Sequence, residues 1–336
     1  MLLFHFLAKR VMKAIVCESF DHPSLLTLTE QPDPELADHQ VLIDVAATGL
    51  GYVDALTVSG LYQIKPPLPF VPGNEIAGTI LATGSQVVHL KPGDRVLAMP
   101  SQGGLAERIS VSADRCHKIS DRLDFAAAAS FLVNYCTAYH GLITCGEITA
   151  SDTVLVLGAS GGVGMAAIDL AKSQGAFVIA AASTEEKQAA ALAAGADLSI
   201  DYSQPAWRDA LKQQLAGRPL TVVYDPVGGD FADPALRSLA PSGRYLVVGF
   251  ASGKIPSIAA NLTLLKQIRV IGVNWGGFIG IHPEASEPVI QSLLNMTTEG
   301  KLNPIAGHRF ALEQAGEAMT TMLERRAIGK VVITQE

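Results

Sequence analysis

Charged residues, metal-binding patterns and long apolar runs are all scarce in this chain. Only 17% of its 336 residues are charged, and the formal net charge is −7. Proteins that bind nucleic acid usually carry basic faces, so this balance argues against a nucleic-acid partner. No apolar run approaches the ~20 residues that a membrane-spanning helix needs. The sequence therefore predicts neither a nucleic-acid-binding protein nor a membrane-embedded one.

Cysteine is also sparse, and its spacing excludes two further classes. The four cysteines contain no CxxC pair, so neither a zinc ribbon nor a disulfide framework is indicated. The eight histidines lack metal spacing as well. We expect most of these thiols to be buried in a reducing cytoplasm. Cys136 is expected to be buried rather than nucleophilic, because no paired His–Cys arrangement can be read from the sequence.

Apolar residues, in contrast, make up 49% of the chain, enough for a substantial core. The length suits two domains of roughly 100–200 residues each. Residues 1–11 are expected to be an extension, with a surface helix as the alternative, because their basic residues follow the apolar stretch. A first strand is expected from Met12.

The pattern of apolar and polar residues changes along the chain. Residues 12–123 are β-rich, with short apolar runs broken by Pro and Gly turns. An Ala-rich helical segment is expected over residues 125–146. From Asp152 to Val273, short apolar runs alternate with helical stretches, which is typical of a parallel sheet covered on both faces. Strands are expected near 153–157, 176–182, 197–201, 221–225, 244–249 and 268–273, and helices near 162–174, 185–194, 205–215 and 230–239.

The remaining residues, 275–336, are predicted to hold helices over 287–299 and 312–325 and a final strand over 330–334. We expect this tail to return to the first domain. The predicted fold class is α/β: a β domain plus a doubly wound, six-stranded parallel Rossmann domain. The predicted domains are residues 12–130 with 275–336, and residues 131–274.

A glycine turn follows the first strand of the predicted parallel sheet. The order of strand, glycine turn and helix is what a dinucleotide pyrophosphate site requires, since the helix start offers free N–H groups to the anion. In this turn Gly161 is expected to turn sharply, Gly162 to leave room for a phosphate, and Gly164 to let the helix approach the strand. The turn consists of Ala159, Ser160, Gly161, Gly162, Val163 and Gly164.

The end of the second strand of that sheet indicates which nicotinamide cofactor binds. NAD sites usually place an Asp or Glu there to bind the ribose hydroxyls. Here the strand ends in alanines and Ser183, so the repulsion of a 2′-phosphate is absent. Ser183 can donate a hydrogen bond, and Lys187 follows. Glu185 and Glu186 argue the other way unless they serve as favourable charge in the first turn of a helix. NADPH is favoured over NADH.

Several motifs in order along the chain make it resemble a known family. They are residues 47–54 (ATGLGYVD), 60–62 (GLY), 71–78 (VPGNEIAG), 91–96 (KPGDRV), 134–140 (NYCTAYH), the glycine turn, 225–229 (DPVGG) and 248–250 (VGF). The chain resembles the zinc-independent NADPH:quinone oxidoreductases of the medium-chain dehydrogenase/reductase superfamily, from about Met12 to Ile333. The order and spacing of these motifs along the chain make the resemblance specific.

The resemblance implies a GroES-like catalytic domain interrupted by the nucleotide-binding domain, with the active site in the cleft between them. It implies homodimers joined through the last strand of the nucleotide domain, here residues 269–273. It also implies 2′-phosphate contacts from Lys187 and Tyr202, with Arg326 as a third candidate. The alternatives are a solvated helix charge for Lys187, a core aromatic for Tyr202 and a surface base for Arg326.

The resemblance also bears on metal. Related alcohol dehydrogenases hold catalytic zinc with Cys, His or carboxylate ligands, and the matching positions here are Gly51, Asn74 and about Val133. None replaces the thiolate and imidazole that zinc prefers. We expect a metal-free enzyme, which excludes zinc-assisted alcohol oxidation.

A metal-free reductase needs an acceptor that takes hydride readily, and quinones and α,β-unsaturated carbonyls do so. The protein must align the reactants and offer a donor to the acceptor oxygen. The resemblance places Tyr62 as an active-site tyrosine and Tyr52 as a cleft-facing aromatic, although either can instead pack against the nicotinamide. Gly51 and Leu56 stand where the family often has Asn and a second aromatic, which predicts a more open and apolar pocket.

Further cofactor-binding residues come from the resemblance. Asn134 and Thr137 belong to the segment beside the nicotinamide ribose, and Phe250 follows the fifth strand. Asp225, Gly228 and Gly229 lie at a strand's carboxyl end, where doubly wound sheets bind ligands.

The predicted function is a cytoplasmic, homodimeric NADPH-dependent quinone or enone reductase with a small-molecule substrate. Two alternatives stay open: an enoyl-thioester or alkenal reductase, and a catalytically quiet NADPH-binding protein.

Overall fold

The computed structural model describes residues 11–335 and divides the chain into two compact units. One, the β-rich unit, comprises residues up to Ser130 and from Ile305 onward. The other, the parallel-sheet unit, is Phe131–Pro304. Apart from Val11, which begins the first strand, the extension expected over residues 1–11 lies outside the described residues.

The parallel-sheet unit contains the six predicted strands, and all of them pair in parallel. They lie in the order β10-β9-β8-β11-β12-β13. The order reverses between β8 and β11, which is where a doubly wound sheet binds its ligand. The predicted six-stranded Rossmann sheet is thus confirmed. The strands are β8 (Thr153–Leu157), β9 (Phe177–Ala182), β10 (Leu198–Asp201), β11 (Val222–Asp225), β12 (Arg244–Val247) and β13 (Arg269–Gly272).

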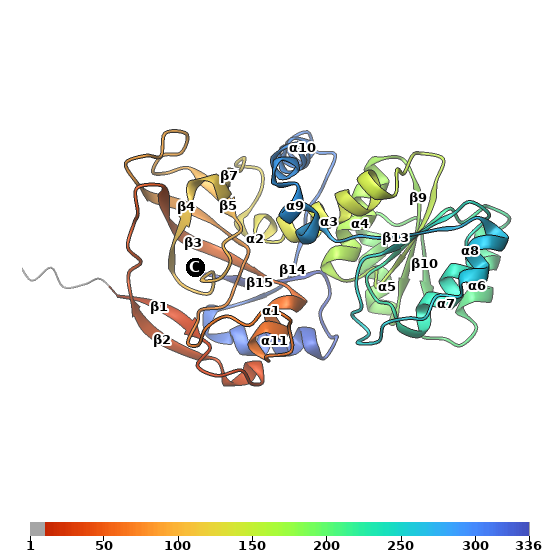
Figure 1. Cartoon of the computed structure of the whole chain (residues 1–336), viewed down its shortest axis with the longest axis horizontal. Helices are drawn as coiled ribbons and strands as arrows, with labels where there is room; N and C mark the ends of the chain where they lie inside the picture. The colour runs from red at the N-terminus through yellow and green to blue at the C-terminus, as the bar shows by residue number, and fades with distance from the viewer. Residues whose placement is uncertain (1–10, 336) are drawn as a thin grey trace, which may run out of the picture. The chain divides into compact units, whose positions relative to one another are not determined.

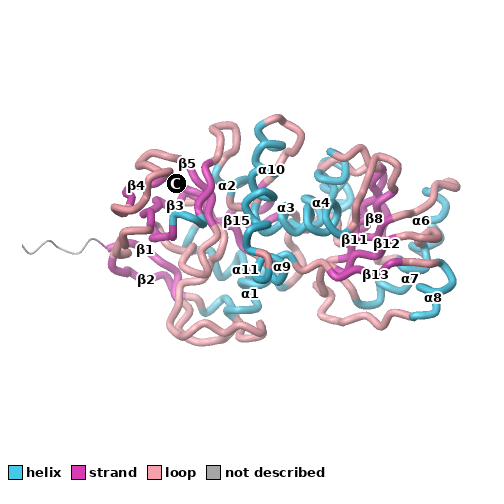
Figure 2. Tube along the Cα trace, turned by 45° about the horizontal axis from the view of Figure 1, so that its top comes forward, coloured by secondary structure: helices cyan, strands magenta, loops and turns pink. Residues whose placement is uncertain are grey.

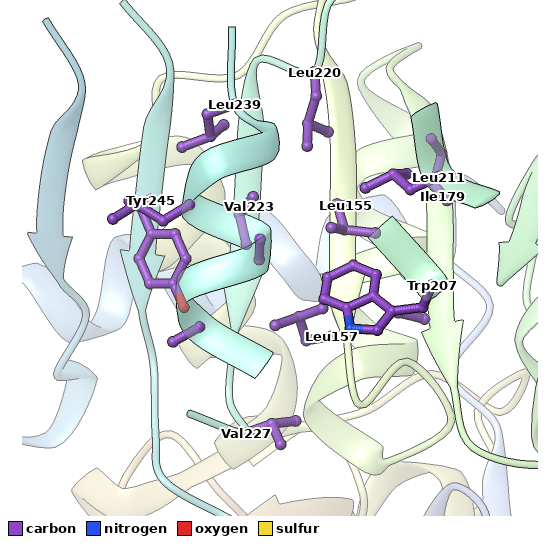
Figure 3. Packing of buried hydrophobic residues seen from close by; sticks show 14 of the residues in the cluster. Leu155, Leu157, Ile179, Trp207, Leu211, Leu220, Val223, Val227, Leu239 and Tyr245 are labelled. Carbon is purple, nitrogen blue, oxygen red and sulfur yellow. The ribbon is translucent and has the colours of Figure 1, made fainter. Parts of the chain in front are cut away.

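Helices cover both faces of this sheet, as Figure 1 shows. On one face, Trp207 and Leu211 of α6 pack with Leu155 and Val223 of the sheet (Figure 3). Leu236 of α7 belongs to the same buried cluster. The buried cluster on this face consists of aliphatic and aromatic side chains, and it holds the helices at fixed positions on the strands. The helices are α4 (Gly162–Ser173), α5 (Glu185–Ala193), α6 (Trp207–Leu215), α7 (Ala232–Ser238) and α8 (Ala260–Lys266), of which α8 was not predicted.

The helical segment expected over residues 125–146 is interrupted. It consists of α2 (Phe125–Ala128), α3 (Leu132–Tyr139) and a π-helix (His140–Cys145). The hydroxyl of Ser130 bonds back to the carbonyl of Ala126, and the boundary between the units falls directly after Ser130. The two parts of this segment therefore belong to different units, and the periodicity within the segment does not reveal that division.

The chain returns to the β-rich unit at Ile305, thirty residues later than the expected return at 275. The reason is that α9 (Trp275–Ile281) and α10 (Ser286–Thr298) belong to the parallel-sheet unit. Trp275 and Phe278 pack their rings near His140, and α10 contacts α3. These aromatic contacts hold the segment against its own unit.

The β-rich unit is built on a mixed sheet in the order β14-β15-β3-β4-β5-β7, with β6 paired to β3. A separate hairpin joins β1 to β2. The strands are β1 (Val11–Val16), β2 (Thr27–Pro32), β3 (Gln40–Leu50), β4 (Ile76–Thr83), β5 (Arg95–Ala98), β6 (Arg108–Ser112), β7 (Cys116–Lys118), β14 (Ala306–Phe310) and β15 (Lys330–Thr334). The predicted final strand is thus β15, which pairs with β14 on one side and β3 on the other.

Two helices of this unit, α1 (Tyr52–Val58) and α11 (Ala315–Leu323), lie side by side (Figures 1 and 2). Ala55 and Val58 of α1 and Met319 of α11 share a buried cluster with Leu50 and Val331 of the sheet. This packing fixes α1 immediately after the end of β3. Within residues 11–335, no helix is long and apolar enough to cross a membrane.

Candidate functional site

The glycine turn joins β8 to α4 in the parallel-sheet unit. The left-handed backbone that glycine favours falls at Gly158 (φ 58°), whereas Gly161 is extended (φ −81°) and caps α4. The sharp turn is therefore three residues earlier than expected. A Cβ on Gly164 would lie 2.4 Å from the Gly158 carbonyl oxygen, so the close helix–strand approach requires glycine there.

The space around the start of α4 fits an anion. A Cβ built on Gly161 would touch only the Gly158 oxygen, at 3.4 Å, so the turn is open on that side. The first N–H groups of the helix are free to bind phosphate oxygens because they have no partner within the helix. Ala159 and Ser160, at the base of the turn, are buried. Val163 follows in the first turn of α4 and is half-buried.

Asn134 packs against the glycine turn. Asn134 lies on α3 and is buried, and a Cβ on Gly162 would meet its amide nitrogen at 2.7 Å. Gly162 thus makes room for the Asn134 side chain. Thr137, one turn further along α3, donates its hydroxyl proton to the Val133 carbonyl at 2.6 Å. Its hydroxyl oxygen can still accept a hydrogen bond.

The end of β9 carries no carboxylate. Ser183 follows the strand, and the Thr184 side chain caps α5 by accepting from the Lys187 N–H at 3.2 Å. Glu185 and Glu186 lie in the first turn of α5, where negative charge favours the helix. This placement supports the helix-charge interpretation of the two glutamates, and it leaves a 2′-phosphate without an opposing acid at the strand end.

Tyr202 reaches the same edge of the sheet from β10. Its N–H donates to the Ala182 carbonyl at 3.2 Å, next to Ser183. Its ring packs against Phe231 with centroids 4.4 Å apart. Tyr202 is therefore both a partner of the core and a neighbour of the strand end. Arg326 belongs to the β-rich unit and pairs with Glu324.

The carboxyl end of β11 is held by Asp225. Its Oδ1 accepts from the Val227 and Gly228 N–H groups, each at 2.8 Å, and its Oδ2 accepts from the Tyr245 hydroxyl. Burial raises the pKa of this carboxyl, and these three donors oppose the rise. Both carboxylate oxygens of Asp225 thus accept hydrogen bonds within the protein, and two of these bonds come from the loop that follows β11. Phe250, 41% exposed, lies over Gly228, so this loop sets the position of that ring.

The β-rich unit contains a pocket of about 260 Å³ at the amino end of α1. Tyr62 lines it, whereas Tyr52, at the first position of α1, does not. Within the described chain, no residue hydrogen-bonds the side chains of Tyr62 or Asn74. These donors face a largely apolar wall. The lining residues are Val53, Asp54, Thr57, Tyr62, Ile64, Pro66, Phe70, Pro72, Gly73, Asn74, Ser101 and Gln102.

Asp54 is the pocket residue that sequence reasoning missed. It is 6% exposed, and its Oδ2 accepts from the Gly51 N–H at 2.7 Å. Burial raises its pKa to about 6. The spacing of Gly51 and Asp54 is that of a helix cap with an acid at the third position, a signal that the sequence did contain. That signal predicts a cap but not a buried acid beside a pocket.

The β-rich unit also contains a buried ion pair between Lys330 and Glu75, the residue that follows the pocket-lining Asn74. The Lys330 Nζ of β15 is 2.8 Å from the Glu75 Oε2, and the two residues are 5% and 0% exposed. A pair this deeply buried is maintained only because each charge compensates the other. Their separation of 255 positions in the chain kept the pair invisible in the sequence.

The structure also bears on metal and thiol chemistry. Within residues 11–335, no three His, Cys, Asp or Glu side chains gather in a metal-binding arrangement. Cys136 is buried, as expected. The sulfur of Cys145 is 3.6 Å from the His140 Nε2, a pairing that the sequence did not reveal. Burial raises the pKa of Cys145 and lowers that of His140, so both groups are neutral and the thiol is not activated.

Comparisons with known proteins match nearly the whole chain. The alcohol dehydrogenase GroES-like domain family matches residues 37–121, and the zinc-binding dehydrogenase family matches residues 162–295. Quinone oxidoreductase-like protein 2 of Bos taurus is 35% identical over 97% of this chain and 93% of its own. Human quinone oxidoreductase is 32% identical over 97% and 98%. The crystal structure of Escherichia coli quinone oxidoreductase complexed with NADPH is 27% identical, covers 96% of this chain and 100% of its own, and has a TM-score of 0.85.

Proposed function

Because the chain belongs to the quinone oxidoreductase family of the medium-chain dehydrogenase/reductase superfamily, we propose that it reduces a quinone or an α,β-unsaturated carbonyl with NADPH and without metal. The observation that carries the substrate class is the pocket of the β-rich unit. Its polar side chains include the Tyr62 hydroxyl and the Asn74 amide, and it contains neither thiolate nor imidazole. Such a pocket suits an acceptor that becomes negative at oxygen and needs donors there.

NADPH fits the residues of the parallel-sheet unit. The start of α4 is open at Gly161 and offers N–H groups to the pyrophosphate. Ser183, Lys187 and Tyr202 flank the end of β9, where no carboxylate opposes a 2′-phosphate. Asn134, Thr137 and Phe250 are proposed to hold the nicotinamide end, and Arg326 remains a predicted 2′-phosphate contact. When bound, NADPH supplies the hydride.

In the pocket of the β-rich unit, Tyr62 and Asn74 are proposed to orient the acceptor. Each can donate a hydrogen bond to the acceptor oxygen, and neither is occupied by another described residue. Buried lining residues such as Phe70 and Pro72 offer apolar contacts to the ring or chain of the acceptor. A volume of about 260 Å³ is close to the lower end of small-molecule sites, roughly 300–1,000 Å³, and suits a small acceptor.

An acceptor panel tests this function. The absorbance of NADPH is followed after addition of quinones, enones, enals and a conjugated acyl thioester. We expect oxidation with a quinone or an enone. Oxidation with the thioester alone would instead indicate an enoyl-thioester reductase. Binding of NADPH without oxidation by any acceptor would indicate a catalytically quiet protein and would reject the proposal.

The two tyrosines give a matched pair of variants. Tyr62→Phe removes a hydroxyl from the pocket, and we expect kcat/KM for the acceptor to fall about tenfold. Tyr52 was predicted alongside Tyr62 but lies outside the pocket lining, so Tyr52→Phe should have a smaller effect. Equal losses in both variants would contradict the role given to the pocket.

We also propose that the protein is a cytoplasmic homodimer joined through β13. This strand is at the edge of the six-stranded sheet, and its Arg269 and Val270 are exposed. An edge strand with open backbone groups is a template for pairing with a second copy. The four free cysteines suit a reducing compartment. Light scattering of the purified protein at several concentrations tests the dimer, and a monomer throughout would reject it.

A further inference from the structure

Asp54 differs from the other polar residues of the pocket in being an acid. It lies in the first turn of α1, with one carboxylate oxygen bonded to the Gly51 N–H at 2.7 Å. Within the part of the chain that the structure describes, no other residue donates a hydrogen bond to Asp54 and no cation pairs with it. The residue lines the pocket, and apart from the Gly51 N–H only its own backbone N–H bonds its carboxylate, so no other residue of the described chain holds the carboxyl group away from a ligand.

The neighbouring charges explain why this acid is left without a partner. Lys330 approaches from β15 and Glu75 from the residue before β4, and these two side chains pair with each other at 2.8 Å. Lys330 attracts negative charge on Asp54, whereas Glu75 repels it. These two are the ionised groups that act on Asp54, and Tyr62 is a further titratable side chain in the lining. Lys330 therefore pairs with Glu75, the closer of the two acids, and Asp54 has no cation partner of its own.

Burial decides the protonation state that results. Removal from water disfavours the carboxylate and is the largest of the effects on Asp54, which together bring its pKa to about 6. A carboxyl group with such a pKa is partly protonated near neutral pH, whereas an ordinary exposed aspartate is almost wholly ionised. The pocket therefore contains a proton that a reaction can use.

We propose that Asp54 is the general acid that protonates the reduced acceptor, an inference that rests on the proposed function. Addition of hydride to the acceptor brings two electrons and leaves the negative charge on its oxygen. The O–H bond of the Asp54 carboxyl then breaks, and an O–H bond forms on that oxygen. The product is a hydroquinone or an enol, which becomes the saturated carbonyl. Asp54 remains as a carboxylate and regains its proton from water.

The other pocket residues have separate roles in this step. Tyr62 and Asn74 donate hydrogen bonds that hold the acceptor oxygen, and the Gly51 N–H fixes the carboxyl group of Asp54 on α1. The Gly51 N–H also stabilises the carboxylate left after proton transfer. Glu75 and Lys330 contact no acceptor; they are positioning residues that set the field at Asp54.

The test compares Asp54→Asn with the wild type and with Asp44→Asn, an exposed aspartate on β3 outside the pocket. Asparagine keeps the acceptor for the Gly51 N–H but cannot deliver a proton. We expect kcat to fall about 100-fold or more in Asp54→Asn, as is typical for loss of a general acid. The dissociation constant of NADPH, measured by fluorescence, should be unchanged, and Asp44→Asn should behave as wild type.

The pH profile separates proton donation from a structural role. In the wild type, kcat should decline about tenfold per pH unit above about pH 6, because the protonated form of Asp54 is consumed. This decline should be absent in Asp54→Asn. Infrared spectra of the cofactor-free protein provide a readout that needs no activity. The carbonyl band of a protonated carboxyl should titrate near pH 6 in the wild type and should be missing in Asp54→Asn.

The outcomes distinguish this inference from the proposed function. If the wild type reduces a quinone or an enone while Asp54→Asn keeps the wild-type kcat and pH profile, the general-acid role is rejected and the function stands. If the wild type reduces no acceptor, both fall. A carboxyl band that titrates near pH 4 in the wild type would also reject the role, because Asp54 would then carry no proton at neutral pH.

Discussion

The two units present different electrostatics to their ligands. In the parallel-sheet unit, the start of α4 offers backbone N–H groups around Gly161, and the one buried acid nearby in the sheet, Asp225, is fully hydrogen-bonded. In the β-rich unit, the pocket contains a buried acid without a cation partner, and a buried ion pair acts on it electrostatically. We therefore expect the affinity for the cofactor to change little with pH, whereas reduction of the acceptor should depend strongly on pH.

The largest expected effect concerns the ion pair of the β-rich unit. Glu75→Gln leaves Lys330 buried at 5% exposure without its counter-charge. We expect the free energy of unfolding to fall by about 3–5 kcal/mol, measured by denaturant titration at neutral pH. The double variant Glu75→Leu with Lys330→Met is the control, because it removes both charges and should recover most of the loss. A single variant within about 1 kcal/mol of wild type would show that water reaches the pair.

The next effect sharpens the contrast in pH response. Burial raises the pKa of Asp54 from 3.8 to about 6, so the folded protein holds this proton more tightly than the unfolded chain. The resulting stabilisation is complete below about pH 4 and is lost as the pH rises through about 6. Above about pH 6, Asp54→Asn should therefore be more stable than wild type, by up to about 3 kcal/mol.

Unfolding curves of the wild type and Asp54→Asn from about pH 4 to about pH 8 measure this difference, which should vanish at the acid end. Asp44→Asn, on the exposed face of β3, should show no such trend. If Asp54→Asn were the less stable protein at about pH 8, the carboxylate would be stabilised by Lys330 and the buried-acid interpretation would be wrong.

A smaller effect concerns the glycine turn of the other unit. A Cβ on Gly164 would lie 2.4 Å from a backbone oxygen, so Gly164→Ala should force α4 away from β8 and cost about 1–3 kcal/mol. Gly161→Ala is the matched control, because its backbone is extended and its Cβ would make only an ordinary van der Waals contact, 3.4 Å from the Gly158 oxygen. Its stability should stay within about 0.5 kcal/mol of wild type.

Binding of NADPH then separates the two glycines, since an alanine methyl group at Gly161 would project into the space proposed for the phosphate. We expect weaker NADPH binding in Gly161→Ala despite unchanged stability, measured by fluorescence titration at two pH values. Unchanged affinity in Gly161→Ala would place the pyrophosphate elsewhere.

The smallest effect concerns cofactor choice. Lys187→Ala should lower the preference for NADPH over NADH about tenfold, because a charge-assisted contact to the 2′-phosphate is worth roughly 1.5–3 kcal/mol before water competes. The dissociation constants of both cofactors are measured. Lys212→Ala, an exposed lysine on α6, is the control for net charge. An unchanged ratio in Lys187→Ala would mean that the lysine is only a solvated helix charge.

The fold of the parallel-sheet unit could be predicted closely because its signals are local. Each strand is a short apolar run followed by a helix, so β8 was predicted with the bounds that the structure shows. In the β-rich unit, β15 was also predicted with its observed bounds, because it too is a short apolar run. The helix α8 was missed since only Leu262 among its residues is buried. The break at Ser130 was missed because the two halves of one helical segment pack into different units.

The residues of the candidate site were likewise predicted only in part. Asn134 and the glycine turn were each predicted to bind the cofactor, and the structure shows that Asn134 lies against Gly162. Tyr62 was predicted and lines the pocket, whereas Tyr52 was predicted and does not. The motif around residue 52 gives the position along α1 but not the direction in which each side chain points, and that direction comes from packing against α11.

The local sequence pattern was enough for the parallel sheet, the phosphate turn and the missing ribose carboxylate, because each is a feature of neighbouring residues. The environment of Asp54 required the folded chain. Its burial, its bond to Gly51 and the Glu75–Lys330 pair that leaves it without a cation join residues from α1, the start of β4 and β15. Desolvation and charge act through space, so a pKa of about 6 arises only when these distant segments pack together.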